Sequence, residues 1–166
     1  MSPIWQLIES INLSEFMLAV AWLLVFANWR SPIIRNIALA NVLIGLVGSQ
    51  LMSYLATLPL EQYRYYWYLG ASTINFVKAL FILALISLNI AYMCKTSAQL
   101  MTIFTLLGLL NIARFIDRFV FDSGASGSWL GTSYSILVPA LNALALIALA
   151  IPVVQRLRSN SKQTSR

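Results

Sequence analysis

Five long, mostly apolar segments of the chain are predicted to be helices that cross a membrane. They cover residues 13–29, 37–58, 68–92, 98–119 and 134–154. Each is close to the ~20 residues that span the ~30 Å hydrocarbon core of a bilayer at ~1.5 Å per residue. Backbone groups in lipid must find hydrogen-bond partners within their own segment, so the segments are expected to be α-helices. The pattern predicts an all-α bundle of about five transmembrane helices.

The polar stretches between these segments are short. Residues 30–35, 59–67 and 94–97 form three connections, and the longest connection, 122–133, is rich in glycine and serine. None of them is long enough to form a second domain. We therefore expect residues 1–155 to form a single bundle. The polar and basic residues 156–166 are expected to form a disordered tail.

Composition narrows the class of protein further. Hydrophobic residues make up 60% of the chain and charged residues 10%, against about 45–50% and about 25% in soluble domains. The chain has no histidine, one cysteine and five acidic residues. This inventory removes histidine-based acid–base catalysis and intrachain disulfides, and it disfavours carboxylate-rich metal sites. The sequence predicts a non-enzymatic membrane protein without a metal or cofactor.

The basic residues predict how the bundle is oriented. Seven of them fall on one side of the membrane in the five-helix topology: Arg30, Arg35, Lys95, Arg156, Arg158, Lys162 and Arg166. The other side has three basic residues and all five acidic ones. Lysine and arginine are enriched in cytoplasmic loops, so the N-terminus is expected outside and the C-terminus in the cytoplasm. On the cytoplasmic side Arg30, Arg35, Lys95, Arg156 and Arg158 are candidates for contact with anionic lipid headgroups or a partner.

Lys78 lies within the third apolar segment. A lysine inside a span costs about 2.5–3.5 kcal/mol on insertion scales, and such residues often have a function. Counting back from Tyr92 places Lys78 ~9 Å below the outer edge of the membrane. The side chain could then extend outward to the headgroups or form a structural ion pair. The alternative is a role in ligand binding or transport.

Lys78 shares a predicted helix face with two amides. Successive steps of three or four residues connect Asn75, Lys78, Ile82, Ile86 and Asn89. Hydrogen bonds between helices are one explanation of this face, and a hydrated path is the other. Glu15, near the outer end of the first segment, could pair with Lys78. It could equally face water at the start of its helix.

Two further groups stand out. Arg114, Asp117 and Arg118 form a charge cluster at the predicted outer end of the fourth segment. It could anchor the helix at the interface through an internal ion pair, or bind an anion through the planar guanidinium groups. The second group lies along one side of the segment 37–58 and is expected to be a helix-packing seam: Asn41, Gly45, Gly48, Ser49 and Met52.

The sequence favours a small, non-enzymatic integral membrane protein that acts through assembly. It would be a subunit or membrane sensor with cytoplasmic partners, in a bacterial inner membrane. The expected partners are the bilayer, its anionic headgroups, and a further copy of the chain or another membrane-complex subunit, and not nucleic acid. The alternative is an oligomeric channel or small-solute transporter with a polar path along the third helix. A lipid-modifying enzyme is the least favoured reading.

Overall fold

The computed structural model describes residues 13–121 and 129–164, and the regular structure in these two ranges is entirely helical. The helices are α2 (Leu13–Ala27), α3 (Pro32–Leu55), α4 (Leu60–Ser87), α5 (Lys95–Phe119) and α6 (Trp129–Thr164). Four of them, α3 to α6, are long and apolar enough to cross a membrane, whereas α2 is shorter. The predicted all-α membrane bundle is confirmed. Large apolar side chains such as Leu23, Val47 and Leu80 face outward, as a lipid-covered surface requires.

The bounds of α4 differ from the predicted span 68–92. The helix begins directly after Pro59, so the polar and aromatic residues that were expected to form a connection are helical. It ends at Ser87, and Asn89 has the left-handed backbone angle φ of 56°. Asparagine adopts this conformation more readily than most residues. Residues 88–92 therefore belong to the connection to α5.

Local chemistry also fixes the start of α5. Cys94 precedes the helix, and its Sγ accepts a hydrogen bond from the Ser97 N–H at 3.4 Å. The Ser97 Oγ accepts one from the Cys94 N–H at 2.8 Å. This reciprocal arrangement is a capping box, which satisfies backbone donors that the first turn leaves without helical partners.

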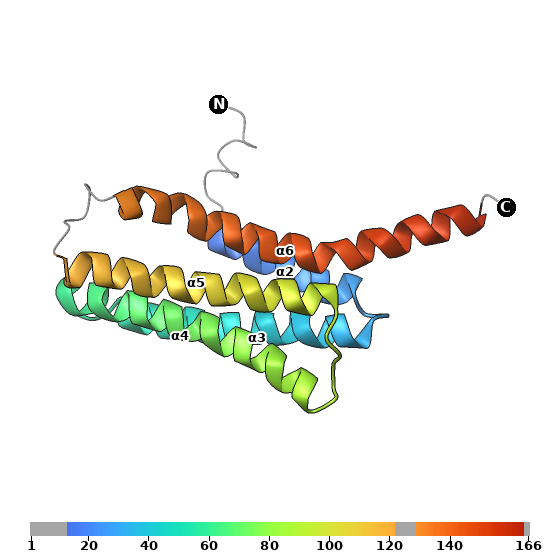
Figure 1. Ribbon diagram of the computed structural model, residues 1–166, viewed down its shortest axis with the longest axis horizontal. Helices are drawn as coiled ribbons and strands as arrows, with labels where there is room; N and C mark the ends of the chain where they lie inside the picture. The colour runs from blue at the N-terminus through green and yellow to red at the C-terminus, as the bar shows by residue number, and fades with distance from the viewer. Residues whose placement is uncertain (1–12, 122–128, 165–166) are drawn as a thin grey trace.

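The last helix is longer than its predicted span 134–154. It begins at Trp129 and continues through Pro139 and Pro152 to Thr164, so that its C-terminal part extends beyond the other helices (Figure 1). The expected disordered tail is thus helical up to Thr164. Glutamine, arginine and lysine are favourable helix formers, so a helix begun in the apolar segment can continue into these polar residues.

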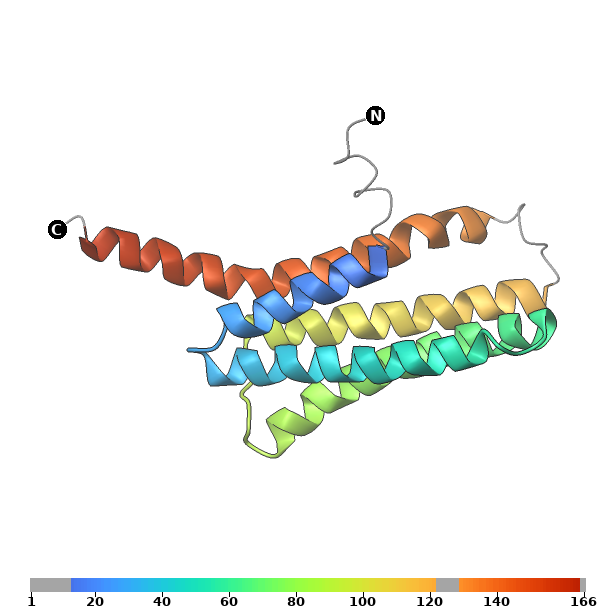
Figure 2. The same cartoon turned by 180° about the vertical axis from the view of Figure 1, so that it is seen from behind.

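The helices pack around α5, which contacts α3, α4 and α6 (Figures 1 and 2). The most extensive interface joins α4 and α5. The side chains of the core are the fully buried ones of α5 and those that meet them from α3 and α6: Leu100, Phe104, Leu107, Ile37, Val42 and Leu149. Buried residues of α2 and α4, such as Val25 and Ile82, complete this core.

Gly108 allows α4 and α5 to approach closely. A methyl group at Gly108 would lie 2.8 Å from ring carbons of Phe76 on α4, which is closer than packed carbon atoms can be. The Ser72 Oγ of α4 also donates a hydrogen bond to the Gly108 carbonyl at 3.0 Å. Small residues let helix backbones in membranes pack closely. Gly108 is the small residue that allows this at the interface of α4 and α5.

Two polar contacts fasten α2 to α6. Asn28 follows the end of α2 and is completely buried. Its Nδ2 donates to the carbonyls of Leu24 at 2.9 Å and Leu149 at 3.1 Å. The Arg156 guanidinium of α6 donates to the Ala27 carbonyl at 3.0 Å. The carbonyls at the C-terminal end of α2 are therefore satisfied partly by α6.

Candidate intramembrane binding site

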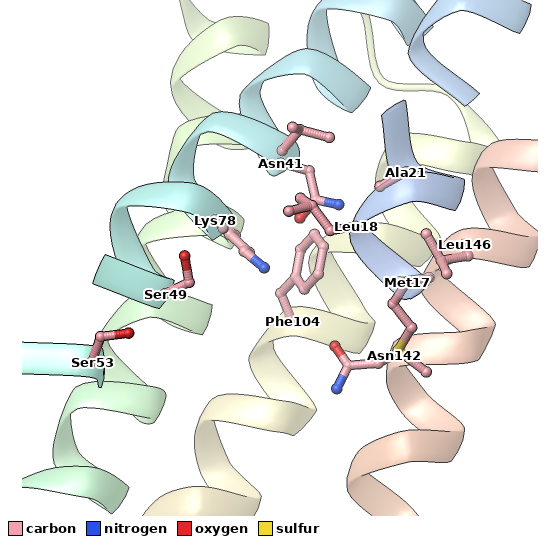
Figure 3. Close-up of a pocket in the computed structure, with 13 residues that line it drawn as sticks. Met17, Leu18, Ala21, Asn41, Ser49, Ser53, Lys78, Phe104, Asn142 and Leu146 are labelled. Carbon is pink, nitrogen blue, oxygen red and sulfur yellow. The ribbon is translucent and has the colours of Figure 1, made fainter. Parts of the chain in front are cut away.

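A partly open cavity of about 460 Å³ lies between the helices and is lined by residues from all five described helices; two of the lining residues, Ser49 and Ser53, are exposed. Figure 3 shows the side chains that surround it. Its polar lining comes mainly from α3, α4 and α6, and its apolar lining mainly from α2, α5 and α6. The principal lining residues are Asn41, Ser49, Ser53, Lys78, Asn142, Met17, Leu18, Phe104 and Leu146.

Lys78 brings a positive charge to this cavity. It lies eighteen residues after Leu60 and nine before Ser87, well inside α4. Its Nζ is 5.2 Å from the centroid of the Phe104 ring, at a distance where a cation is attracted to the face of an aromatic ring. Figure 3 shows the ammonium pointing into the space between α3 and α5. It therefore points between the helices and does not extend to either end of α4.

Gly45 of α3 leaves room for the lysine head group. A methyl group built at Gly45 would lie 3.9 Å from the Lys78 Nζ, and no other side-chain atom is within 4 Å of that position. A larger side chain at residue 45 would take space from the cavity beside the ammonium. The predicted packing seam of α3 therefore also forms a wall of the cavity.

The described side chains give Lys78 no carboxylate partner. They include two carboxylates, Glu61 and Asp117. Glu61 lies in the exposed first turn of α4, and Asp117 pairs with Arg114. The predicted pairing with Glu15 lies outside the described side chains, although residue 15 belongs to the first turn of α2.

Amide and hydroxyl groups complete the polar side of the cavity. The Asn142 Nδ2 donates to the Val138 carbonyl at 2.9 Å, and the Ser49 Oγ donates to the Leu46 carbonyl at 2.8 Å. In both bonds the side chain donates, so the Asn142 Oδ1 and the Ser49 Oγ can still accept hydrogen bonds from a ligand. The Oδ1 of Asn41 is buried and has no hydrogen-bond partner among the described residues. Because buried polar groups are normally paired, the region around Asn41 retains unused hydrogen-bonding capacity.

A second cavity, of about 280 Å³, continues from Lys78 toward the start of α6. The two cavities share Gly45, Ser49, Lys78 and Asn142 as lining residues. The second is lined in addition by Asn75, Asn111 and Tyr134, among others. The Tyr134 hydroxyl donates to the Asn111 Oδ1 at 2.7 Å. Polar groups from Asn41 to Tyr134 thus line two adjoining open cavities, and Lys78 lines both.

The polar face predicted from sequence is only partly assembled. Asn75 and Lys78 line the same cavity. Asn89 is exposed and lies in the connection after α4, because the helix ends at Ser87. Sequence reasoning did not connect Asn41, Phe104 or Asn142 with Lys78. They lie on three other helices, and only the packing of these helices brings them together with Lys78 around one cavity.

The charge cluster of α5, formed by Arg114, Asp117 and Arg118, contacts neighbouring helices. Arg114 is only 4% exposed, forms an ion pair with Asp117, and has its guanidinium packed against Gly131 of α6. The Arg118 Nη1 donates to the Tyr68 hydroxyl of α4 at 3.2 Å. Both arginines therefore join α5 to neighbouring helices at this end of the bundle.

The predicted cytoplasmic basic residues gather at the opposite end, where α2 ends and α3 and α5 begin (Figure 1). Arg30 and Lys95 are exposed. Arg35 lies over the Trp29 ring at 4.9 Å. Arg156 contacts the end of α2, and exposed Arg158 follows it on the extension of α6. The structure thus groups these five residues around one rim.

Fold and composition define the class: this is an α-helical integral membrane protein with a polar cavity inside its bundle. Comparison of the chain with protein-family models, with curated proteins and with solved structures finds no match.

Proposed function

We propose that this protein is a transporter that carries a small organic anion through its helix bundle. The observation that supports this most directly is the Lys78 ammonium, which faces a cavity surrounded by all five described helices. A lysine inside a membrane protein is costly unless its charge is compensated. The described side chains provide no carboxylate for it, so an anionic ligand is the natural counter-ion.

The size and lining of the cavity favour an organic anion over a halide. About 460 Å³ falls within the range of pockets that hold small organic ligands. Leu18, Phe104 and Leu146 offer an apolar surface beside the ammonium. A carboxylate with a short aliphatic or aromatic body would place its charge at Lys78 and its body against these side chains.

The second cavity favours transport over binding alone. It meets the first at Lys78 and continues along Asn75, Asn111 and Tyr134. A solute could therefore pass from one half of the bundle to the other by way of the ammonium. Both cavities lie within one chain, so the proposal is a solute transporter and does not need the oligomeric channel that the sequence left open.

The test is uptake into liposomes that contain the purified protein. Acetate, butyrate, benzoate and chloride are compared at equal concentration, with protein-free liposomes as the blank. We expect protein-dependent uptake of at least one of the larger carboxylates, and competition between carboxylates. Uptake of chloride alone would contradict the organic-anion proposal, and absence of uptake and binding of every anion would overturn the proposed function.

We further propose that the protein resides in a bacterial inner membrane with the rim formed by Arg30, Lys95 and Arg158 in the cytoplasm. The excess of basic residues on that side supports this orientation. Reporter fusions after Ser97 and at the C-terminus are expected to read as cytoplasmic, and a fusion within residues 122–133 as external. An external C-terminus would contradict the orientation.

A role as an assembly subunit or sensor is the second candidate, and the extension of α6 favours it. This helix continues past the other helices and carries Arg156 and Arg158 on its extension (Figure 1). Removal of residues 157–166 takes away Arg158 and retains the Arg156 contact with α2, so the bundle is expected to stay folded while a cytoplasmic partner is lost. Affinity purification of both forms from the host, followed by mass spectrometry, measures this. An unchanged set of partners would contradict it.

A further inference from the structure

A groove on the outer surface of the bundle lies between α5 and α6 and is separate from the two cavities that Lys78 lines. Its volume is about 530 Å³, and it shares no lining residue with either of them. Lys95, Ala98, Thr102 and Ile103 line it from α5, and Ile147 and Ala148 are among the residues that line it from α6. Ala98, Thr102 and Ile147 are exposed on the surface that lipid covers.

The groove changes in character along its length. Lys95, the first residue of α5, is exposed and gives one end a positive charge. Beyond it the lining is largely apolar, and the Thr102 hydroxyl is satisfied by the Ala98 carbonyl at 3.0 Å. Alanines at positions 98 and 148 keep the groove open between the two helices. The groove is therefore cationic at the rim of the bundle and apolar toward its middle.

The length of the groove matches one leaflet of a bilayer. From Lys95 to Ile103 the helix rises about 12 Å, at ~1.5 Å per residue. Half of the hydrocarbon core is about 15 Å thick. A lipid chain that enters the groove would thus extend from the interface to the middle of the membrane, with its headgroup at the level of Lys95.

We propose that this groove binds an anionic phospholipid, with one acyl chain between α5 and α6 and the headgroup phosphate at Lys95. The charge of the lysine selects the anionic headgroup, and the positive end of the α5 dipole acts in the same direction. The proposal concerns a surface site and does not depend on transport through the bundle.

The experiment measures lipid retained by the protein, purified in mild detergent, by native mass spectrometry. Phosphatidylglycerol and phosphatidylcholine with identical acyl chains are added at equal concentration. We expect phosphatidylglycerol to be retained about fivefold more, which corresponds to one favourable lysine–headgroup contact. Lys95→Gln is expected to remove this preference and to leave phosphatidylcholine binding unchanged. Arg64→Gln, at the start of α4, is the matched control and should retain the preference.

The acyl-chain part of the proposal is tested separately. Ala98→Phe fills the groove from an exposed position and is expected to lower retention of both lipids, whereas Ala140→Phe, on an exposed part of α6 outside the groove, should not. Ile147→Trp provides a second obstruction if the first variant is unstable. Equal retention of the two lipids by the unmodified chain would overturn the proposal. An unchanged preference in Lys95→Gln, or unchanged retention of both lipids in Ala98→Phe and Ile147→Trp, would do the same.

Discussion

Replacing Lys78 by methionine is expected to abolish carboxylate uptake and to weaken carboxylate binding by at least about 30-fold. This factor corresponds to about 2 kcal/mol, the lower end of the loss seen when one member of a buried charge pair is removed. Methionine keeps a long flexible side chain that can still pack against Phe104, and it removes the cost of a charge in the membrane. Helicity and detergent stability are therefore expected to be retained. Uptake assays on the reconstituted protein measure the loss of transport, and equilibrium binding measures the loss of carboxylate affinity.

Two further variants separate charge from structure. Lys78→Arg keeps a cation in the cavity and should retain anion binding at reduced affinity. Arg64→Met removes a positive charge from an exposed position on the same helix and should leave uptake unchanged. A different outcome would indicate a protein counter-ion: if Lys78→Met destabilises the bundle and Glu15→Gln restores it, the ammonium is paired with Glu15. That result would contradict the role of an anionic solute as its partner.

Gly108→Ala is expected to lower the free energy of unfolding by about 1–3 kcal/mol, the usual cost of adding a group to a packed interior. The new methyl group would lie 2.8 Å from Phe76 ring carbons, so either the ring or the helix must move. Movement of α5 would also weaken the hydrogen bond from Ser72 to the Gly108 carbonyl. Reversible unfolding in mixed micelles, followed by the helical circular dichroism signal, measures the change.

Gly45→Ala is the matched control for this prediction. It makes the same chemical change in a helix, but the nearest atom to the added methyl group, the Lys78 Nζ, is 3.9 Å away. Because alanine favours helix by about 1 kcal/mol over glycine, stability should be unchanged or somewhat higher. If both variants show the same stability, close packing at Gly108 is not what holds α4 against α5.

The helical segments were predictable because membrane spans produce long apolar runs that are visible in one sequence. Their ends were less predictable. Glu61 in the first turn is a helix-start signal, but the aromatic residues that follow are equally typical of an interfacial loop, so the sequence placed the start of α4 too late. The left-handed conformation of Asn89 ends the helix before Tyr92, and sequence periodicity alone cannot reveal a backbone angle.

The candidate site was predictable only at its charged residue. A lysine in an apolar segment is conspicuous, and Asn75 lies one turn from it on the same helix. Asn41 and Gly45 were recognised as members of a packing seam, but nothing in the chain indicated that this seam faces Lys78. Asn142 lies in an alanine-rich helix where an amide is equally compatible with packing. The cavity depends on which helix faces meet, and that follows from tertiary packing.

The contacts between α2 and α6 have a consequence for the order in which the bundle is completed during synthesis. Asn28 and the carbonyl of Ala27 are synthesised long before α6, yet their partners Leu149 and Arg156 belong to α6. Until α6 has been inserted, the end of α2 must satisfy these groups with water or lipid headgroups at the membrane surface. α2 can therefore reach its final position only when α6 arrives, and the docking of α6 completes the lining of the cavity.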